Sequence, residues 1–139
     1  MAELSFTNRA RPPSRLPVLK KPPVWDKKLY AAHGVLLAAI VYDVEVTDRA
    51  LQRGKCAEGN IDLGQHPTHG ALYRNNLLKQ FVPVVAIDWF AVWVGLRANW
   101  NSEHPPPSWQ WRLLGYEGPV YGSFVHFRGG TKWLENNCF

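Results

Sequence analysis

The sequence predicts an all-α protein: a small bundle of two to four transmembrane helices behind an extended, proline-rich N-terminal tail. Two features lead to this prediction. Apolar segments at about residues 29–51 and 77–97 are each long enough, at about 1.5 Å per residue, to cross a bilayer core of about 30 Å. The first 28 residues contain five prolines and seven positive charges, which excludes a continuous helix and favours extended backbone.

We expect a tail at residues 1–28 and one helical membrane domain at residues 29–139. Hydrophobic residues make up 46% of the sequence and charged residues only 19%, below the roughly 25% of an average protein. The net charge of +5 suits nucleic acid, anionic lipid or an acidic partner, and by itself it selects none of them. The soluble alternative is a compact helical domain with two buried helices.

The first apolar segment carries polar residues that suit the interior of a helix bundle. Leu36, Ile40, Asp43 and Thr47 recur at a spacing of three and four residues, so they share one helix face. The Thr47 hydroxyl could then donate to the Asp43 carboxylate one turn away and partly offset the cost of burial. We interpret Asp43 as a structural residue, and the alternatives are a proton or ion site and a plain surface position.

The second apolar segment, LLKQFVPVVAIDWFAVWVGL, holds one acid, Asp88, near its centre. A central aspartate opposes insertion by about 2.5–3.5 kcal/mol, which the many apolar neighbours can offset at about 0.3–0.6 kcal/mol each. We therefore predict a membrane helix in which Asp88 is a structural polar residue that faces protein. The connector before this helix should reach about Asn75, with Asn75 or Asn76 as the N-cap.

A third, weaker apolar stretch lies at residues 113–127. Gly115, Gly118 and Pro119 interrupt it, so a broken helix, a re-entrant element and a soluble hairpin are the alternatives. Seven basic residues precede the first helix, against five in and around the connector. Because positive charge favours the cytoplasmic side, this bias puts the tail in the cytoplasm. We expect the chain to lie in the inner membrane.

Whether the two cysteines can pair depends on how often the chain crosses the membrane. If the third stretch also crosses, Cys56 and Cys138 finish on the same external side and can form a disulfide. With only two crossings they face opposite sides and cannot pair.

His33 and His126 are the candidate cofactor ligands, because single histidines of membrane helices can ligate haem or the magnesium of a chlorophyll-type pigment. The alternative is a hydrogen bond to a neighbouring helix or a position among the lipid headgroups. His66 and His69 lie in the connector, but their spacing matches no strong zinc template, so we expect no metal site. We find no catalytic triad order or glycine-rich phosphate loop and expect no enzyme.

The sequence also resembles a family of small bacterial integral-membrane proteins of unknown function. The first helix of that family ends in an Asp, three residues and a Thr, followed by a Gly and a Glu-x-Asn. The matching residues here are Asp43, Thr47, Gly54, Glu58 and Asn60. The resemblance continues through a Lys that opens the second helix and a His and an Asn in the C-terminal helix, here Lys79, His126 and Asn136. It implies a compact bundle of three or four membrane helices and no activity.

Together these features favour a non-catalytic accessory subunit that stabilises a larger membrane complex, of the respiratory or photosynthetic kind. Its helices would pack against larger membrane subunits and lipid, and we expect no nucleic-acid partner. The tail residues that would contact the partner are Arg9, Arg11, Arg15, Lys20 and Lys21. The alternatives are a soluble basic module for nucleic acid, which needs a continuous positive face, and a small membrane carrier of haem or pigment.

Overall fold

The structure is a computed structural model that describes residues 27–58, 63–98 and 108–138. Every regular element in these ranges is helical, which confirms the predicted all-α class. Helix α1 spans Lys27–Gln52 and α4 spans Ser108–Glu135. Between them, α2 (His69–Asn76), η1 (Leu77–Phe81) and α3 (Val82–Ala98) follow one another without a break. Residues 1–26 of the predicted tail lie outside the described residues, whereas Lys27 and Lys28 form the start of α1.

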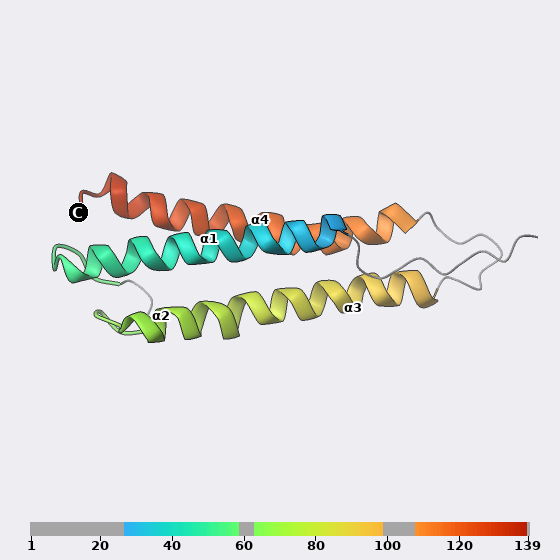
Figure 1. Cartoon of the computed structure of the whole chain (residues 1–139), viewed down its shortest axis with the longest axis horizontal. Coiled ribbons are helices and arrows are strands. Elements are labelled where there is room, and N and C mark those ends of the chain that lie inside the picture. Colours follow the sequence, from blue (N-terminus) through green and yellow to red (C-terminus); the bar gives the residue numbers. More distant parts are fainter. Residues whose placement is uncertain (1–26, 59–62, 99–107, 139) are drawn as a thin grey trace, which may run out of the picture.

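The helices lie side by side (Figure 1). Helices α1 and α4 run in the same direction, and the α2–η1–α3 helix runs in the opposite direction. Helix α4 packs mainly on α1 and also on α3. One buried apolar cluster comprises Leu36, Ile40, Val44, Leu51 and Leu72, and a smaller one comprises Leu29, Val92 and Leu96. Two helices, Lys27–Gln52 and His69–Arg97, are long and apolar enough to cross a membrane.

The second long helix begins earlier than the sequence predicts. Its N-cap is Thr68, whose Oγ1 accepts a hydrogen bond from the backbone N–H of Ala71 at 3.3 Å. The prediction of Asn75 or Asn76 as the cap was wrong, because both lie inside the helix. The Asn76 side chain instead donates to the carbonyl of Leu72 at 3.0 Å.

The wide π-helical turn η1 accommodates a proline in this helix. Pro83 has no N–H to donate, and its ring would clash with the carbonyl four residues earlier in a regular helix. In the preceding turn the N–H of Val82 donates to the carbonyl of Leu77, five residues back. The helix therefore continues past Pro83 through a single turn of π-helix.

Helix α4 settles the alternatives for the third apolar stretch, because it is one continuous helix with Pro119 inside it. Its glycines face the other helices at close range. A Cβ at Gly115 would lie 2.8 Å from Cγ2 of Val92, and one at Gly122 would lie 2.8 Å from Cδ1 of Leu36. The absence of side chains at these positions lets the backbones approach, as small residues do between membrane helices.

Gly118→Ala is expected to lower the free energy of unfolding by about 1–3 kcal/mol. The new Cβ would lie 2.9 Å from both Oδ2 of Asp88 and Cγ1 of Val84. Gly34→Ala is the matched control, because Gly34 is an exposed helical glycine with no atom within 4 Å of an added Cβ. The control should gain about 0.5–1 kcal/mol. Denaturation in mixed micelles, followed by circular dichroism, measures both variants, and equal stabilities would contradict the packing described.

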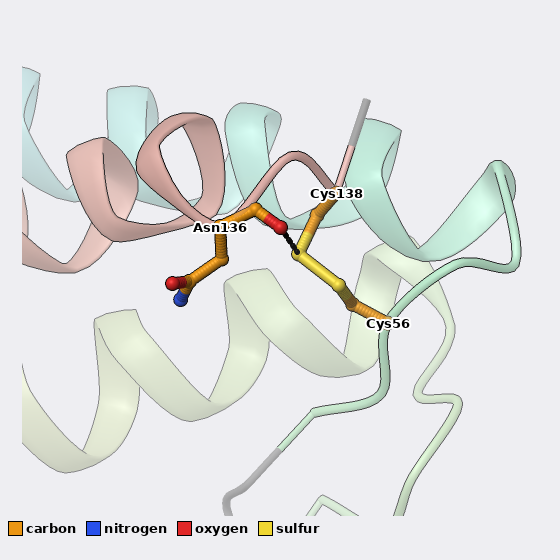
Figure 2. Close-up of a disulfide and its surroundings, with 3 residues drawn as sticks. All are labelled: Cys56, Asn136 and Cys138. Atoms are coloured by element: carbon orange, nitrogen blue, oxygen red, sulfur yellow. Dashed lines mark hydrogen bonds between the residues drawn. A yellow bond between two sulfur atoms is a disulfide. The ribbon is translucent and has the colours of Figure 1, made fainter.

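A disulfide between Cys56 and Cys138 joins the loop after α1 to the segment after α4 (Figure 2). The bond connects positions 82 residues apart, with a Cα–Cα distance of 5.6 Å. The Sγ atom of Cys138 lies 3.9 Å from the carbonyl oxygen of Asn136. Because a disulfide sulfur carries no proton, this is a contact rather than a hydrogen bond. Of the two alternatives that the sequence left open, the structure thus shows Cys56 and Cys138 paired.

Candidate functional site

The exposed surface of the helices is apolar, whereas several polar side chains are buried. In the 18-residue apolar window of the His69–Arg97 helix, only 11% of residues are buried. Ile87 is 66% exposed and Phe90 is 58% exposed, while Asp88 between them is 6% exposed. The other buried polar side chains are His33, Thr47, Asn76, Ser123 and His126. Exposed large apolar side chains together with buried, paired polar ones are typical of helices that pack within a membrane.

The first buried pair joins α1 to α3. Nε2 of His33 lies 3.1 Å from Oδ2 of Asp88, and the side chains are 5% and 8% exposed. On the other side of the ring, Nδ1 of His33 donates to the carbonyl of Leu29 at 2.9 Å. Because a carbonyl can only accept, Nδ1 must carry a proton.

This geometry places one proton between His33 and Asp88. Either an imidazolium donates to the carboxylate, or a protonated Asp88 donates to the lone pair of a neutral imidazole. Both forms have the same total charge. The pair therefore remains neutral overall within an apolar surrounding, which lowers the cost of burying it.

The second buried pair joins α1 to α4, ten residues further along α1, which is about 15 Å along the helix axis. Nδ1 of His126 lies 2.8 Å from Oδ2 of Asp43, with side chains 5% and 19% exposed. An ionised Asp43 accepts the hydrogen bond from Nδ1–H of His126, and in this tautomer a neutral imidazole has its lone pair on Nε2. The apolar side chains of Leu36 and Ile40 lie on α1 between the two pairs.

The buried Asp88 and the half-buried Asp43 each lie against a glycine of α4. A Cβ at Gly118 would lie 2.9 Å from Oδ2 of Asp88, and a Cβ at Gly129 would lie 3.0 Å from Oδ1 of Asp43. The glycines therefore make the space that the two carboxylates occupy. The sequence indicated Gly118 only as a helix interruption, because its role depends on a contact between helices.

A polar cavity of about 240 Å³ lies between α1, the α2–η1 segment and α4, near the disulfide end. Its polar lining residues are Asp43, Thr47, Glu58, Asn75, Asn76, Gln80 and His126. The wall also includes Trp133 and several aliphatic side chains. Four of these polar residues also carry the resemblance to the bacterial membrane family: Asp43, Thr47, Glu58 and His126.

Two buried polar groups in this cavity lack a hydrogen-bond partner within the described part of the chain. They are Nε2 of His126 and Oγ1 of Thr47, in residues 4% and 5% exposed. Among buried side-chain nitrogen and oxygen atoms of the described residues, only Nε1 of Trp111 lacks both a partner and access to solvent. The two cavity atoms must therefore be reachable from the cavity.

The predicted hydrogen bond from Thr47 to Asp43 is not formed. Oδ2 of Asp43 instead meets His126, which arrives from α4. A local spacing of four residues indicates that two side chains share a helix face, but it does not decide which partner lies closer. The Thr47 hydroxyl is consequently left for the cavity.

A third cluster lies outside the cavity and joins α1 to α2. The hydroxyl of Tyr73 donates to Oε1 of Glu45 at 2.9 Å, and Nε2 of His69 lies 3.2 Å from the same oxygen. The two rings are 4.9 Å apart. His69, the first residue of α2, thus contacts a carboxylate of α1. No group of three metal-ligating side chains occurs among the described residues.

The two histidines differ in their capacity to ligate a haem or a pigment. Both ring nitrogens of His33 contact protein, so ligation there would require breaking one of these interactions. Nε2 of His126 is free to coordinate, but the adjoining cavity of about 240 Å³ is smaller than the roughly 300–1,000 Å³ typical of cofactor sites.

The sequence singled out all four members of the buried pairs but did not pair them. His33 and His126 entered as possible cofactor ligands, and Asp43 and Asp88 as structural acids. The predicted tail contacts lie outside the described residues. Comparisons of the chain with protein-family models, with curated proteins and with solved structures find no match.

Proposed function

We propose that the chain is a non-catalytic, integral-membrane accessory subunit that stabilises a larger membrane complex. The observation that carries the proposal is the combination of an apolar exterior with His–Asp pairs in the interior. An apolar exterior is stable in contact with lipid tails, whereas its exposure to water costs free energy. The pairs hold the three helices to one another inside the bilayer.

The disulfide supports a sidedness for this bundle. Disulfides persist in oxidising compartments, so the end that carries Cys56 and Cys138 would face outward. The start of α1 lies at the opposite end (Figure 1). The basic tail would then lie in the cytoplasm, as the seven basic residues before residue 29 also favour.

The contact with the larger complex is proposed on the exposed face of α3. Trp93 lies between two aromatic neighbours, with ring centroids 6.0 Å from Trp89 and 6.2 Å from Phe90. All three rings are exposed in the isolated chain. An apolar groove beside them is lined by Phe81, Val85 and other α3 residues. A transmembrane helix of a partner subunit would fit this surface, while Arg9, Arg11, Arg15, Lys20 and Lys21 would contact its cytoplasmic side.

We also propose that the chain belongs to the small bacterial membrane family that it resembles. The resemblance gains support from geometry, since four of the positions that carry it lie together. Asp43, Thr47, Glu58 and His126 line one cavity. Gly54 has a φ of +70°, a backbone conformation that glycine adopts without strain, in the turn that leaves α1.

Purification of the tagged chain from its native membranes in a mild detergent tests the accessory role. The chain should co-purify with larger membrane proteins, and Phe90→Ala should weaken that association. Phe124→Ala is the matched control, because Phe124 on α4 is 61% exposed against 58% for Phe90. Recovery of the wild type alone, or as a soluble monomer that binds nucleic acid with a steep salt dependence, would contradict the proposal.

A further inference from the structure

The cavity at the disulfide end has the chemistry of a binding site for a small cation. Among the described residues that line it are the carboxylates of Asp43 and Glu58, and none is a lysine or arginine. The two groups without partners, Nε2 of His126 and Oγ1 of Thr47, can both accept hydrogen bonds. A ligand that donates hydrogen bonds and carries positive charge therefore matches this lining.

The side chains of the cavity wall indicate which class of cation fits. Trp133 and aliphatic side chains line part of the wall, and an aromatic face favours a nearby cation. No group of three His, Cys, Asp or Glu side chains that could hold a metal ion occurs in the described residues. An organic cation with a short apolar portion fits these surroundings better than a bare divalent metal.

We propose that this cavity binds a small primary ammonium group. The ammonium donates one hydrogen bond to the lone pair of His126 Nε2 and another to Thr47 Oγ1, while Asp43 fixes the imidazole through Nδ1. The Asp43 carboxylate also supplies the countercharge. The proposal goes beyond the accessory role and does not depend on it, because every residue of the site belongs to this chain.

The disulfide and the wide turn of the second helix shape the site. Glu58 follows Cys56 by two residues, and Trp133 precedes Cys138 by five, so the disulfide ties two parts of the cavity wall together. Gln80 lies in the π-helical turn and donates to Oδ1 of Asn76 at 2.8 Å. Such turns occur frequently at functional sites.

Two sources could supply the ammonium group: a water-soluble amine, or the ethanolamine headgroup of a lipid. The experiment uses protein with ¹⁵N-labelled histidine in micelles and follows the Nε2 resonance of His126 during titration with n-butylammonium chloride. We expect a saturable shift with a Kd on the order of 1 mM. Sodium butanoate and n-butanol, of the same chain length, should cause no shift, and the resonances of exposed His66 serve as an internal reference.

Variants assign the effect to the cavity. Thr47→Val removes one acceptor at nearly constant volume and should weaken binding by about tenfold, which corresponds to roughly 1.4 kcal/mol. Asp43→Asn should weaken it at least as much. Glu45→Gln removes a carboxylate of α1 that does not line the cavity and should leave the Kd unchanged.

Lipid nanodiscs distinguish the two sources. If phosphatidylethanolamine shifts the His126 resonance relative to pure phosphatidylcholine, the ligand is a lipid headgroup; if only butylammonium does, it is a soluble amine. The proposal is overturned if neither probe shifts the resonance, if butanoate acts like butylammonium, or if Thr47→Val binds as the wild type does. None of these outcomes bears on co-purification with a larger complex, so the two proposals can fail separately.

Discussion

Replacement of Cys56 and Cys138 by serine is expected to lower the free energy of unfolding by about 4–5 kcal/mol. The bond closes a loop between residues 82 positions apart, and in the chain-entropy account a longer loop gives a larger stabilisation. The loss should appear as a lower midpoint of denaturation in micelles under oxidising conditions.

The single variants Cys56→Ser and Cys138→Ser control this experiment. Each removes the same bond, so each should lose about as much stability as the double variant. Wild-type protein treated with a reductant should show the same loss, which separates the cross-link from the effect of the serine side chains. A double variant as stable as the oxidised wild type would show that the cross-link adds nothing to the fold.

His33→Leu is expected to destabilise the bundle by about 3–5 kcal/mol, because it leaves Asp88 buried without its partner. The double variant His33→Leu/Asp88→Leu should recover most of this loss, since two apolar side chains then replace a pair that was neutral overall. The pair is 3.1 Å apart and its side chains are 5% and 8% exposed, so solvent cannot substitute for the missing imidazole.

A matched control exists in the loop before α2. His66→Leu makes the same chemical change at an exposed position and should change the free energy of unfolding by less than about 0.5 kcal/mol. Denaturation of all three variants in the same micelles gives the comparison. If the single and double variants at the buried pair lose equal stability, the coupling between His33 and Asp88 is absent.

The sequence predicted the class of the fold because its strongest signals are local. Apolar segments of sufficient length at residues 29–51 and 77–97 indicate helices wherever they pack. The predicted start of the second helix was wrong, because the N-cap is Thr68 rather than Asn75 or Asn76. In α4, Gly118 and Pro119 suggested an interruption, but packing against α1 and α3 maintains the helix.

The candidate site was visible in the sequence only as isolated residues. Asp43 and His126 are 83 positions apart, and no spacing rule joins them before the helices are packed. The cavity depends on still more distant contributions, from the loop after α1 and from the end of α4. The sequence nevertheless contained one indication. The predicted membrane segments hold His33 and His126 as well as Asp43 and Asp88, so each histidine could form a pair with an aspartate of another segment.

The central proposal is that the helical bundle spans the membrane, with the disulfide end outside and the tail inside. Labelling of right-side-out membrane vesicles with an impermeant maleimide, after mild reduction, tests it most directly. The account predicts that Cys56 and Cys138 react without permeabilisation, whereas a Lys20→Cys variant reacts at residue 20 only after the vesicles are opened. Native cysteines that react only in opened vesicles, or a cysteine at residue 20 that reacts in sealed ones, would contradict the account.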